Sequence, residues 1–176
     1  VDLRQEHHLF VNGKPFSEFS PCFSGNIGKT PEQILEGEKV LKHRLQHHPI
    51  LSLHKVKRKD HCFTIGDTEV IEVEVDELMT EQEITKRLGI GYVRFSVQDH
   101  FAPDASMVDH FIHFVKSLPE NTWLHFHCRG GRGRTSTFML MYDMIKNHAY
   151  LAKEDFFIRQ VLLGGKDLNK PSKKHK

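Results

Sequence analysis

The 176-residue sequence has few of the features that mark specialised classes of protein. It holds three cysteines, an odd number without regular spacing, which argues against a disulfide framework and against a zinc site. No apolar run approaches the roughly 20 residues that a membrane-spanning helix requires. The net charge is only +2, so the chain is not basic enough overall to indicate nucleic-acid binding. What remains is an ordinary globular chain, long enough for one domain.

The start of the chain shows no signal-like segment, and Val1-Asp2-Leu3-Arg4 is typical of the middle of a strand. We therefore expect a domain excised from a longer protein. Basic residues gather at the other end, from Lys166 to Lys176, where we expect a tail. The 14 histidines form no HExxH or comparable array of ligands, so we expect no metal site.

Hydrophobic periodicity and turn signals predict strands that alternate with helices. Two capping boxes, Thr30-Pro31-Glu32-Gln33 and Thr80-Glu81-Gln82-Glu83, predict helix starts, and Asp104 is a candidate N-cap for a third helix. The first predicted elements are a strand 1–11 that closes on Asn12-Gly13 and a helix from 31 to about 47. A hairpin or crossover follows within 50–75, in which Gly66-Asp67 separates Cys62–Ile65 from 69–75. The remaining elements are a helix from 80 to about 89, a strand 92–97, a helix ending at 118, a strand 123–127, and helices 135–147 and 153–163. This alternation predicts an α/β fold with a central, mainly parallel sheet flanked by helices.

The strongest motif is the segment from His127 to Thr135, between a predicted strand and a predicted helix. Its three glycines, Gly130, Gly131 and Gly133, allow successive backbone N–H groups to converge on one anion. The following helix adds the positive end of its dipole at the same place. We call the loop from Cys128 to Arg134 the phosphate cradle.

Each polar side chain of the cradle fits phosphate chemistry. We expect the loop to lower the pKa of Cys128 from roughly 8.5 to about 4–6, which makes it a thiolate nucleophile at neutral pH. Arg134 can bind two phosphate oxygens with its planar guanidinium. The hydroxyl of Thr135 can donate to the sulfur. The alternative, a buried cysteine ahead of a glycine-rich turn, does not explain why arginines accompany the glycines between a strand and a helix.

A cysteine phosphatase also needs a general acid for the leaving oxygen. Asp99 follows a predicted strand, which places it near the carboxyl end of the sheet, where α/β proteins bind ligands. His100 either orients Asp99 or packs beside it. The predicted mechanism has two steps: Cys128 attacks phosphorus while Asp99 protonates the leaving alcohol, and water, positioned by Gln160, then hydrolyses the phosphocysteine. No metal or other cofactor is required.

Five segments in order resemble the protein-tyrosine-phosphatase superfamily, most closely its phytase-like branch of cysteine phytases and inositol polyphosphate phosphatases. These segments are Asp2-Leu3-Arg4-Gln5-Glu6, Thr80-Glu81-Gln82-Glu83, Asp99-His100, Trp123-Leu124-His125-Phe126-His127-Cys128 with the cradle, and Arg159-Gln160 with Gly164-Gly165. The resemblance implies a phosphatase core in residues 1–165, without the family's N-terminal segment, and a basic tail in 166–176. It implies Cys128 as nucleophile, Arg134 as phosphate-binding arginine and Asp99 as acid.

The resemblance also implies residues around the pocket. Arg4 and Glu6 would lie beside it, and Lys57, with its neighbours Lys55 and Lys59, would approach the ligand from the segment 50–75. The family's Asp-Trp-Ala-Asn is replaced here by Phe23-Ser24-Gly25-Asn26, so the orientation of the inositol ring is open.

Arg129 and Arg132 are extra cations in the cradle, where many relatives have neutral or acidic residues. Physically they favour a substrate with several phosphates over a single phosphotyrosine, unless they point to solvent or pair with acids such as Glu6. We therefore expect an inositol polyphosphate phosphatase.

The substrate is either a soluble inositol phosphate such as phytate or a phosphoinositide headgroup. No membrane-docking helix is evident in the sequence, which favours a soluble substrate, while peripheral membrane contact stays open. A protein tyrosine or dual-specificity phosphatase is the main alternative, and an inactive phosphate-binding module the second. A working thiolate fits a reducing environment, as in the cytosol or for a bacterial protein that is secreted or delivered to a host.

Overall fold

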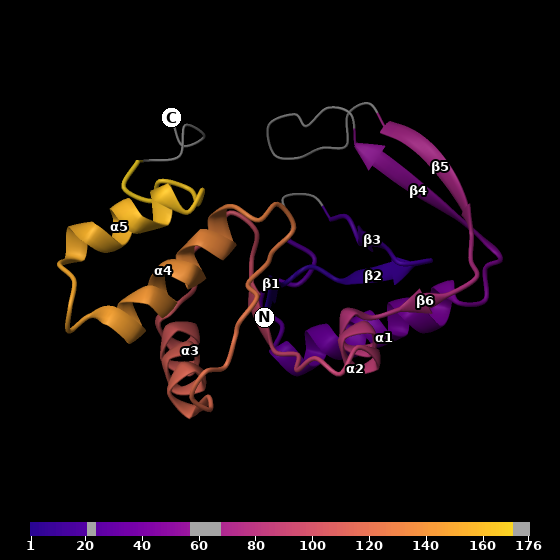
Figure 1. Cartoon of the computed structure of the whole chain (residues 1–176). Coiled ribbons are helices and arrows are strands. Elements are labelled where there is room, and N and C mark those ends of the chain that lie inside the picture. Colours follow the sequence, from indigo (N-terminus) through magenta and orange to yellow (C-terminus); the bar gives the residue numbers. More distant parts are fainter. Residues whose placement is uncertain (21–23, 57–67, 171–176) are drawn as a thin grey trace. The chain divides into compact units, whose positions relative to one another are not determined.

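The computed structural model describes residues 1–20, 24–56 and 68–170, which fall into two compact units (Figure 1). The first unit combines Val1–Arg4 with Val93–Lys176, and the second is Gln5–Tyr92. Each unit has a hydrophobic core of its own. Among the described residues no helix is both long enough and apolar enough to cross a membrane.

The first unit is built on a pair of parallel strands, β1 (Asp2–Arg4) and β7 (Arg94–Val97). The extended segment before Cys128 lies along the other edge of β1. There the Leu3 N–H donates to the His127 carbonyl (3.0 Å), and the His127 N–H donates to the Val1 carbonyl (3.1 Å). The strand expected at 123–127 thus appears as a short extended segment with one bridge, Asp2 to His127. It leads directly into the cradle.

Three helices complete the first unit: α3 (Ala105–Ser117), α4 (Gly133–Asn147) and α5 (Lys153–Leu162). The predicted cap of α3 is confirmed, because Asp104 Oδ1 accepts the Met107 N–H at 2.8 Å. The core between strands and helices is aromatic, with Phe111 4.9 Å from Phe138 and 5.4 Å from Phe95 between ring centroids. Cys128 packs against this cluster, which anchors the first residue of the cradle.

The second unit contains a three-stranded antiparallel sheet in the order β3-β2-β6. Its strands are β2 (His8–Val11), β3 (Lys14–Ser17) and β6 (Leu78–Met79). The predicted Asn12-Gly13 turn joins β2 to β3, and both residues have positive φ, 49° and 77°. Such left-handed backbone favours asparagine and glycine.

Two helices of the second unit begin at the predicted capping boxes. α1 (Pro31–Leu45) is capped by Thr30 with Gln33, and α2 (Glu81–Arg87) by Thr80 with Glu83. In both cases the threonine hydroxyl accepts one orphan N–H while the long side chain accepts another, so four residues are enough to start each helix. α1 is also tied to β2, because a buried carboxylate of α1, Glu38, accepts the backbone N–H of His8 at 3.0 Å.

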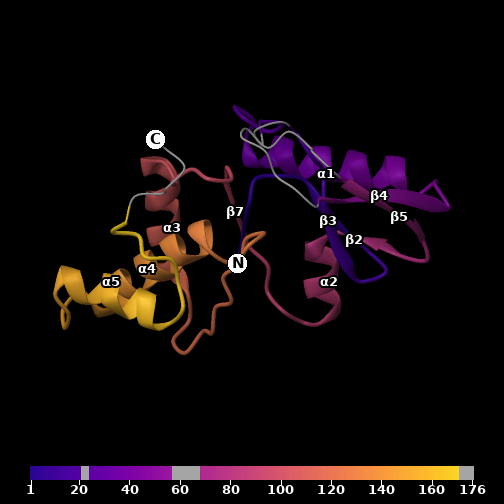
Figure 2. The ribbon, with the colours of Figure 1, turned by 90° about the horizontal axis from the view of Figure 1, so that it is seen from above.

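The β-rich stretch forms an antiparallel ribbon of β4 (Ile50–Val56) and β5 (Thr68–Glu74), paired along its whole length (Figure 2). The pairing therefore joins residues 50–56 to residues 68–74. The expected strand Cys62–Ile65 and the Gly66-Asp67 turn lie outside the described residues.

Two expectations about the strands need correction. The single strand 1–11 is wrong: residues 2–4 pair with β7 in the first unit, whereas residues 8–11 pair with β3 and β6 in the second. The mixed α/β class is observed, but the sheets are small, and among the described strands parallel pairing is confined to β1 with β7 and the Asp2–His127 bridge. Alternating apolar residues predict extended backbone, but they do not specify which neighbour it pairs with.

Candidate active site

The cradle ends in the first turn of α4, so helix and loop form one structure. α4 begins at Gly133, two residues earlier than predicted, and its N-cap residue Arg132 makes no side-chain capping hydrogen bond. Gly131 has φ +62°, a left-handed conformation that lets the loop curl back toward the helix. The N–H groups of the first turn are therefore directed at the loop and not at a side-chain cap, as anion binding requires.

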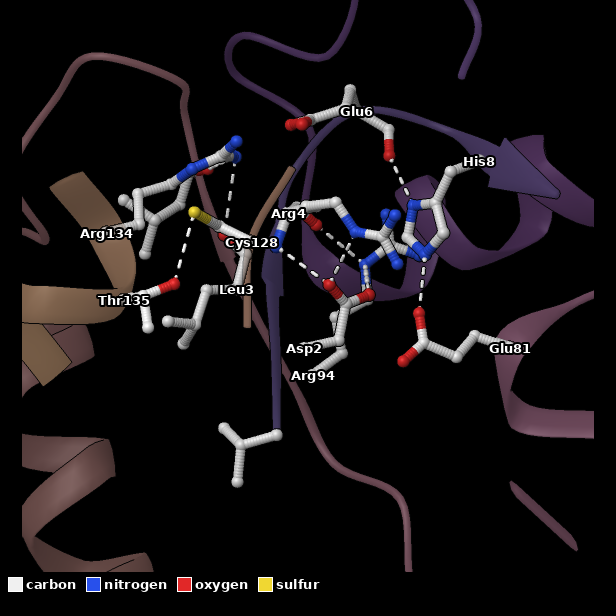
Figure 3. A network of polar contacts seen from close by, with 12 residues as sticks. Asp2, Leu3, Arg4, Glu6, His8, Glu81, Arg94, Cys128, Arg134 and Thr135 are labelled. Atoms are coloured by element: carbon white, nitrogen blue, oxygen red, sulfur yellow. Dashed lines mark hydrogen bonds and ion pairs between the residues drawn. The ribbon is translucent and has the colours of Figure 1, made fainter. Parts of the chain in front are cut away.

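Cys128 is half-buried at the start of the cradle, and its Sγ accepts a hydrogen bond from Thr135 Oγ1 at 3.2 Å (Figure 3). Burial by itself raises the pKa of the thiol. The Thr135 hydroxyl, the backbone N–H groups of Thr135 and Arg132, and the charge of Arg134 together outweigh burial, so the pKa of Cys128 lies below its usual value. The direction of the shift agrees with the sequence prediction.

The side chain of Arg134 is held from several sides. It is 4% exposed. Its Nη1 donates to the carbonyls of Val97 (3.0 Å) and Leu3 (3.4 Å), one in each parallel strand. These bonds fix the guanidinium at β1 and β7, so its remaining N–H groups have a defined direction.

Asp99 lies two residues beyond β7, and its Oδ1 is 3.1 Å from Arg134 Nη2. The structure thus brings the predicted acid to the predicted phosphate-binding arginine. His100 has φ +69°, an uncommon conformation for a residue with a side chain, and its backbone N–H donates to Asp99 Oδ1 at 3.1 Å. Its ring Nε2 lies 3.6 Å from Asp99 Oδ2, close enough for His100 to orient the carboxylate.

The remaining cradle residues form its open side. Arg129, Arg132 and the three glycines are exposed. The two arginines therefore add positive charge at the rim of the loop, where the non-reacting parts of a substrate would lie.

Arg4 is buried in β1, and its Nε donates to Asp2 Oδ1 at 2.9 Å. Arg94 completes this group: its Nε lies 3.5 Å from Asp2 Oδ2 and donates to the Arg4 carbonyl at 2.7 Å. Arg94 was not expected at this position, because it lies 90 residues along the chain from Arg4 and no sequence signal connects the two. This charge cluster (Figure 3) braces β1 against β7, the strands that hold Arg134.

Of the other expected residues, Glu6 and Gln160 lie in the described part of the chain. Glu6 belongs to the second unit, where it lines a cavity of about 260 Å³ together with Glu18, Asn26 and Lys29. Gln160 is buried on α5 and packs against Gly165. Lys57 lies outside the described residues.

Comparison with known proteins gives one family and several close structures. The model of the PTP-like phytase family, described as "Inositol hexakisphosphate", matches residues 1–146. The structure is similar to that of the PTP-like myo-inositol phosphatase from Mitsuokella multacida in complex with myo-inositol-(1,3,4,5)-tetrakisphosphate. The TM-score is 0.88 at 37% identity, over 99% of this chain and 29% of that one. A PTP-like phytase from Bdellovibrio bacteriovorus gives a TM-score of 0.67 at 36% identity, over 92% of this chain and 55% of that one.

One curated relative is named as an effector protein. Effector protein hopD2 of Pseudomonas syringae pv. tomato is 30% identical over 167 residues, which are 93% of this chain and 35% of that protein. The chain therefore spans about a third of the length of this relative.

Proposed function

The chain belongs to the PTP-like phytase family, and on that premise we propose that it is a cysteine-dependent phosphatase of inositol polyphosphates. The observation that carries the proposal is the convergence of four side chains in the first unit: Cys128 with Thr135, and Arg134 with Asp99. A nucleophile, a donor to its sulfur, a phosphate-binding cation and an acid are the parts that the reaction needs.

In the first step, the Cys128 thiolate attacks phosphorus and forms a P–S bond while the bond from phosphorus to the ester oxygen breaks. Asp99, in its protonated form, gives its proton to the leaving oxygen. Arg134 and the backbone N–H groups of the cradle bind the phosphoryl oxygens as charge spreads over them. The products of this step are an alcohol and phosphocysteine.

In the second step, water attacks the phosphocysteine, and the P–S bond breaks. Asp99, now a carboxylate, accepts a proton from the water. Thr135 donates to the sulfur as its negative charge returns, which makes the thiolate a better leaving group. Inorganic phosphate leaves, and Cys128 is ready for another cycle. Gln160 was expected to position the water. Because Gln160 is buried on α5 and packs against Gly165, we propose instead that it holds the end of α5 in place.

The substrate class rests on the exposed cations of the cradle. Arg129 and Arg132 stand at the rim, whereas Arg134 serves the reacting phosphate. Additional phosphates on the same inositol ring can pair with the rim arginines, whereas a small monophosphate has no further anionic group to pair with them. The likeness to a phosphatase whose structure was determined in complex with an inositol tetrakisphosphate supports the same class.

The proposal is tested by comparing kcat/KM on inositol hexakisphosphate, a water-soluble phosphoinositide and a phosphotyrosine peptide. We expect turnover of the inositol compounds to exceed that of the peptide. Activity on the peptide alone would replace this proposal by a protein tyrosine phosphatase. Binding without turnover of any of the three would identify an inactive phosphate-binding module.

Substitution of the rim arginines tests the specificity argument. Arg129→Ala and Arg132→Ala should reduce kcat/KM on inositol hexakisphosphate about tenfold or more, as expected for a charge-assisted hydrogen bond worth about 1.5–3 kcal/mol. Their effect on 4-nitrophenyl phosphate should be much smaller. Lys116→Ala, which removes an exposed cation from the end of α3, is the matched control. Equal losses on both substrates would remove the argument for a polyphosphate.

The likeness to a protein named as an effector supports the further expectation that this protein is delivered to a host. A reducing host cytosol would keep Cys128 as the thiol on which the mechanism depends.

A further inference from the structure

The C-terminal end of α5 exposes a group of apolar side chains that the sequence analysis did not single out. α5 buries Phe156 and Gln160, one turn apart, against the rest of its unit. On the other side, Ile158, Val161 and Leu162 follow at helical spacing, and Leu163 comes next. Leu162 is 80% and Leu163 69% exposed, and Ile158 is also more than half exposed. Contiguous exposed apolar groups of this kind mark contact surfaces. We call Ile158, Val161, Leu162 and Leu163 the apolar tip.

The apolar tip lies at the same end of the first unit as the cradle. After α5 the chain turns at Gly164, with φ +85°, and the Gly165 N–H donates to the Gln160 carbonyl at 2.9 Å. The Lys166 N–H then donates to the buried Ser136 Oγ at 2.8 Å. Ser136 is in the first turn of α4, two residues after Arg134. This connection, visible where the yellow chain returns to the start of α4 in Figure 1, brings the C-terminal end of α5 close to the N-terminal end of α4, where the cradle ends.

Positive charge surrounds this end of the unit. Arg129 and Arg132 are exposed on the cradle, and Lys166 is partly exposed after the turn. Lys170 is also exposed, although Asp167 pairs with it at 3.0 Å. The acidic residues of α5, Glu154 and Asp155, stand in its first turn, at the opposite end of the helix. Apolar side chains next to cations complement a lipid surface with anionic headgroups, since the chains enter the interface while the cations meet the phosphates.

We propose that the apolar tip docks the protein on anionic lipid bilayers, with the cradle at the level of the headgroups. This inference rests on the proposed function and narrows it, because the preferred substrate becomes the phosphorylated headgroup of an inositol lipid. The contact is shallow and reversible: a few apolar side chains enter the interface and a small number of cations lie near its surface.

Vesicle sedimentation tests the docking separately from catalysis. The whole chain, carrying Cys128→Ser to prevent hydrolysis, is mixed with vesicles of phosphatidylcholine alone or of phosphatidylcholine with phosphatidylserine. Phosphatidylserine supplies anionic charge without offering an inositol phosphate to the cradle. We expect binding to the mixed vesicles only. The variant Leu162→Gln/Leu163→Gln should bind them about tenfold or more weakly, because it lacks the two leucine side chains that would be transferred from water into the bilayer interface.

The matched control is Val40→Gln, which replaces an exposed apolar residue on α1 of the second unit and should leave binding unchanged. The expected difference between the two variants assigns the contact to the apolar tip. Absence of binding to anionic vesicles at low salt would overturn the proposal. Binding that salt abolishes but the leucine variant retains would also overturn it, because cations alone would then explain the contact. A dimer that the leucine variant dissociates would assign the tip to a second copy of the chain instead.

Activity measurements distinguish failure of this inference from failure of the proposed function. With Cys128 present, the leucine variant should hydrolyse soluble inositol hexakisphosphate at the original rate and lose activity only on phosphoinositide in vesicles. If the original protein hydrolyses soluble inositol phosphate but binds no vesicle, the function stands and the docking is wrong. If it binds vesicles through the leucines but hydrolyses no inositol compound, the docking stands and the proposed function is wrong.

Discussion

Arg134 Nη2 and Asp99 Oδ1 lie 3.1 Å apart, although 34 residues separate them from one another in the chain. The pair connects the first turn of α4 to the loop after β7. The guanidinium is held by the carbonyls of Val97 and Leu3, so it is Asp99 that can move when a phosphate approaches. In the proposed mechanism, a phosphate bound by Arg134 would compete with Asp99 for this N–H group, and the carboxyl would then serve the ester oxygen. The proposed proton transfer requires Asp99 to lie close to the residue that binds the phosphate, and Arg134 is the proposed residue.

Asp99→Asn should slow the formation of phosphocysteine from inositol hexakisphosphate by roughly 10²–10⁴, because an amide cannot give a proton to the leaving oxygen. Rapid-quench measurement of the first turnover reads this step directly. With 4-nitrophenyl phosphate the loss should be far smaller, since nitrophenolate leaves without being protonated. An unchanged rate on the inositol substrate would mean that another residue is the acid.

Cys128→Ser should abolish turnover and leave the affinity for inositol hexakisphosphate largely intact. The hydroxyl is a poor nucleophile at neutral pH, whereas the backbone N–H groups and Arg134 that bind phosphate are retained. Calorimetric titration measures the affinity, and phosphate release measures the turnover. Residual turnover near the original level would exclude Cys128 as the nucleophile.

Thr135→Val should raise the pKa of Cys128, because it removes the hydroxyl that donates to Sγ. The hydroxyl stabilises the thiolate more than the thiol, so the pKa should increase when it is removed. The thiolate forms above this pKa, and the alkylation rate with iodoacetamide should therefore reach half its maximum at a higher pH in the variant.

Thr137→Val is the control for that measurement. Thr137 is in the same helix, and its hydroxyl donates to the Gly133 carbonyl at 3.0 Å. Its replacement should leave the alkylation profile in place. The same displacement in both variants would show that the helix, and not the bond to sulfur, determines the pKa.

Gly165→Ala should destabilise the protein by about 1–3 kcal/mol, the usual cost of inserting an atom into packed structure. A Cβ at this position would lie 2.7 Å from the Gln160 carbonyl oxygen, so the turn after α5 has to move. Urea unfolding measures the change. Gly91→Ala, where an added Cβ meets no atom within 4 Å, should change the free energy of unfolding by less than about 0.5 kcal/mol. Equal effects would mean that the turn is not closely packed.

Local signals in the sequence predicted many features of both units correctly. The capping boxes at Thr30 and Thr80, the cap at Asp104 and the turn at Asn12 are all confirmed. Each depends on hydrogen bonds or backbone angles within about four residues, so the residues that determine it are adjacent in the chain. The bond from Thr135 to Cys128 was predictable for a similar reason, because both residues belong to one loop and the first turn of its helix.

Tertiary structure decided which strands pair and which distant residues come into contact. Residues 1–11 read as one strand, yet β1 and β2 belong to different sheets and units. The carbonyl of Leu3 that holds Arg134 comes from 131 residues away, and the bracing of β1 by Asp2 and Arg94 also joins segments that are far apart in the chain. Periodicity specifies that a segment is extended or helical, but competition among all possible neighbours selects the one that it meets.

The phosphate cradle and the apolar tip of α5 illustrate the two cases. The spacing from Cys128 to Thr135 by itself predicted the loop and the helix start that follows it, since the cysteine, the glycines and the arginine are contiguous in the chain. Only the tertiary structure decided that Asp99 meets Arg134 and that Leu162 and Leu163, at the end of α5, face solvent. An apolar residue in a helix has the same identity whether it is buried or exposed, so its role follows from what packs against it.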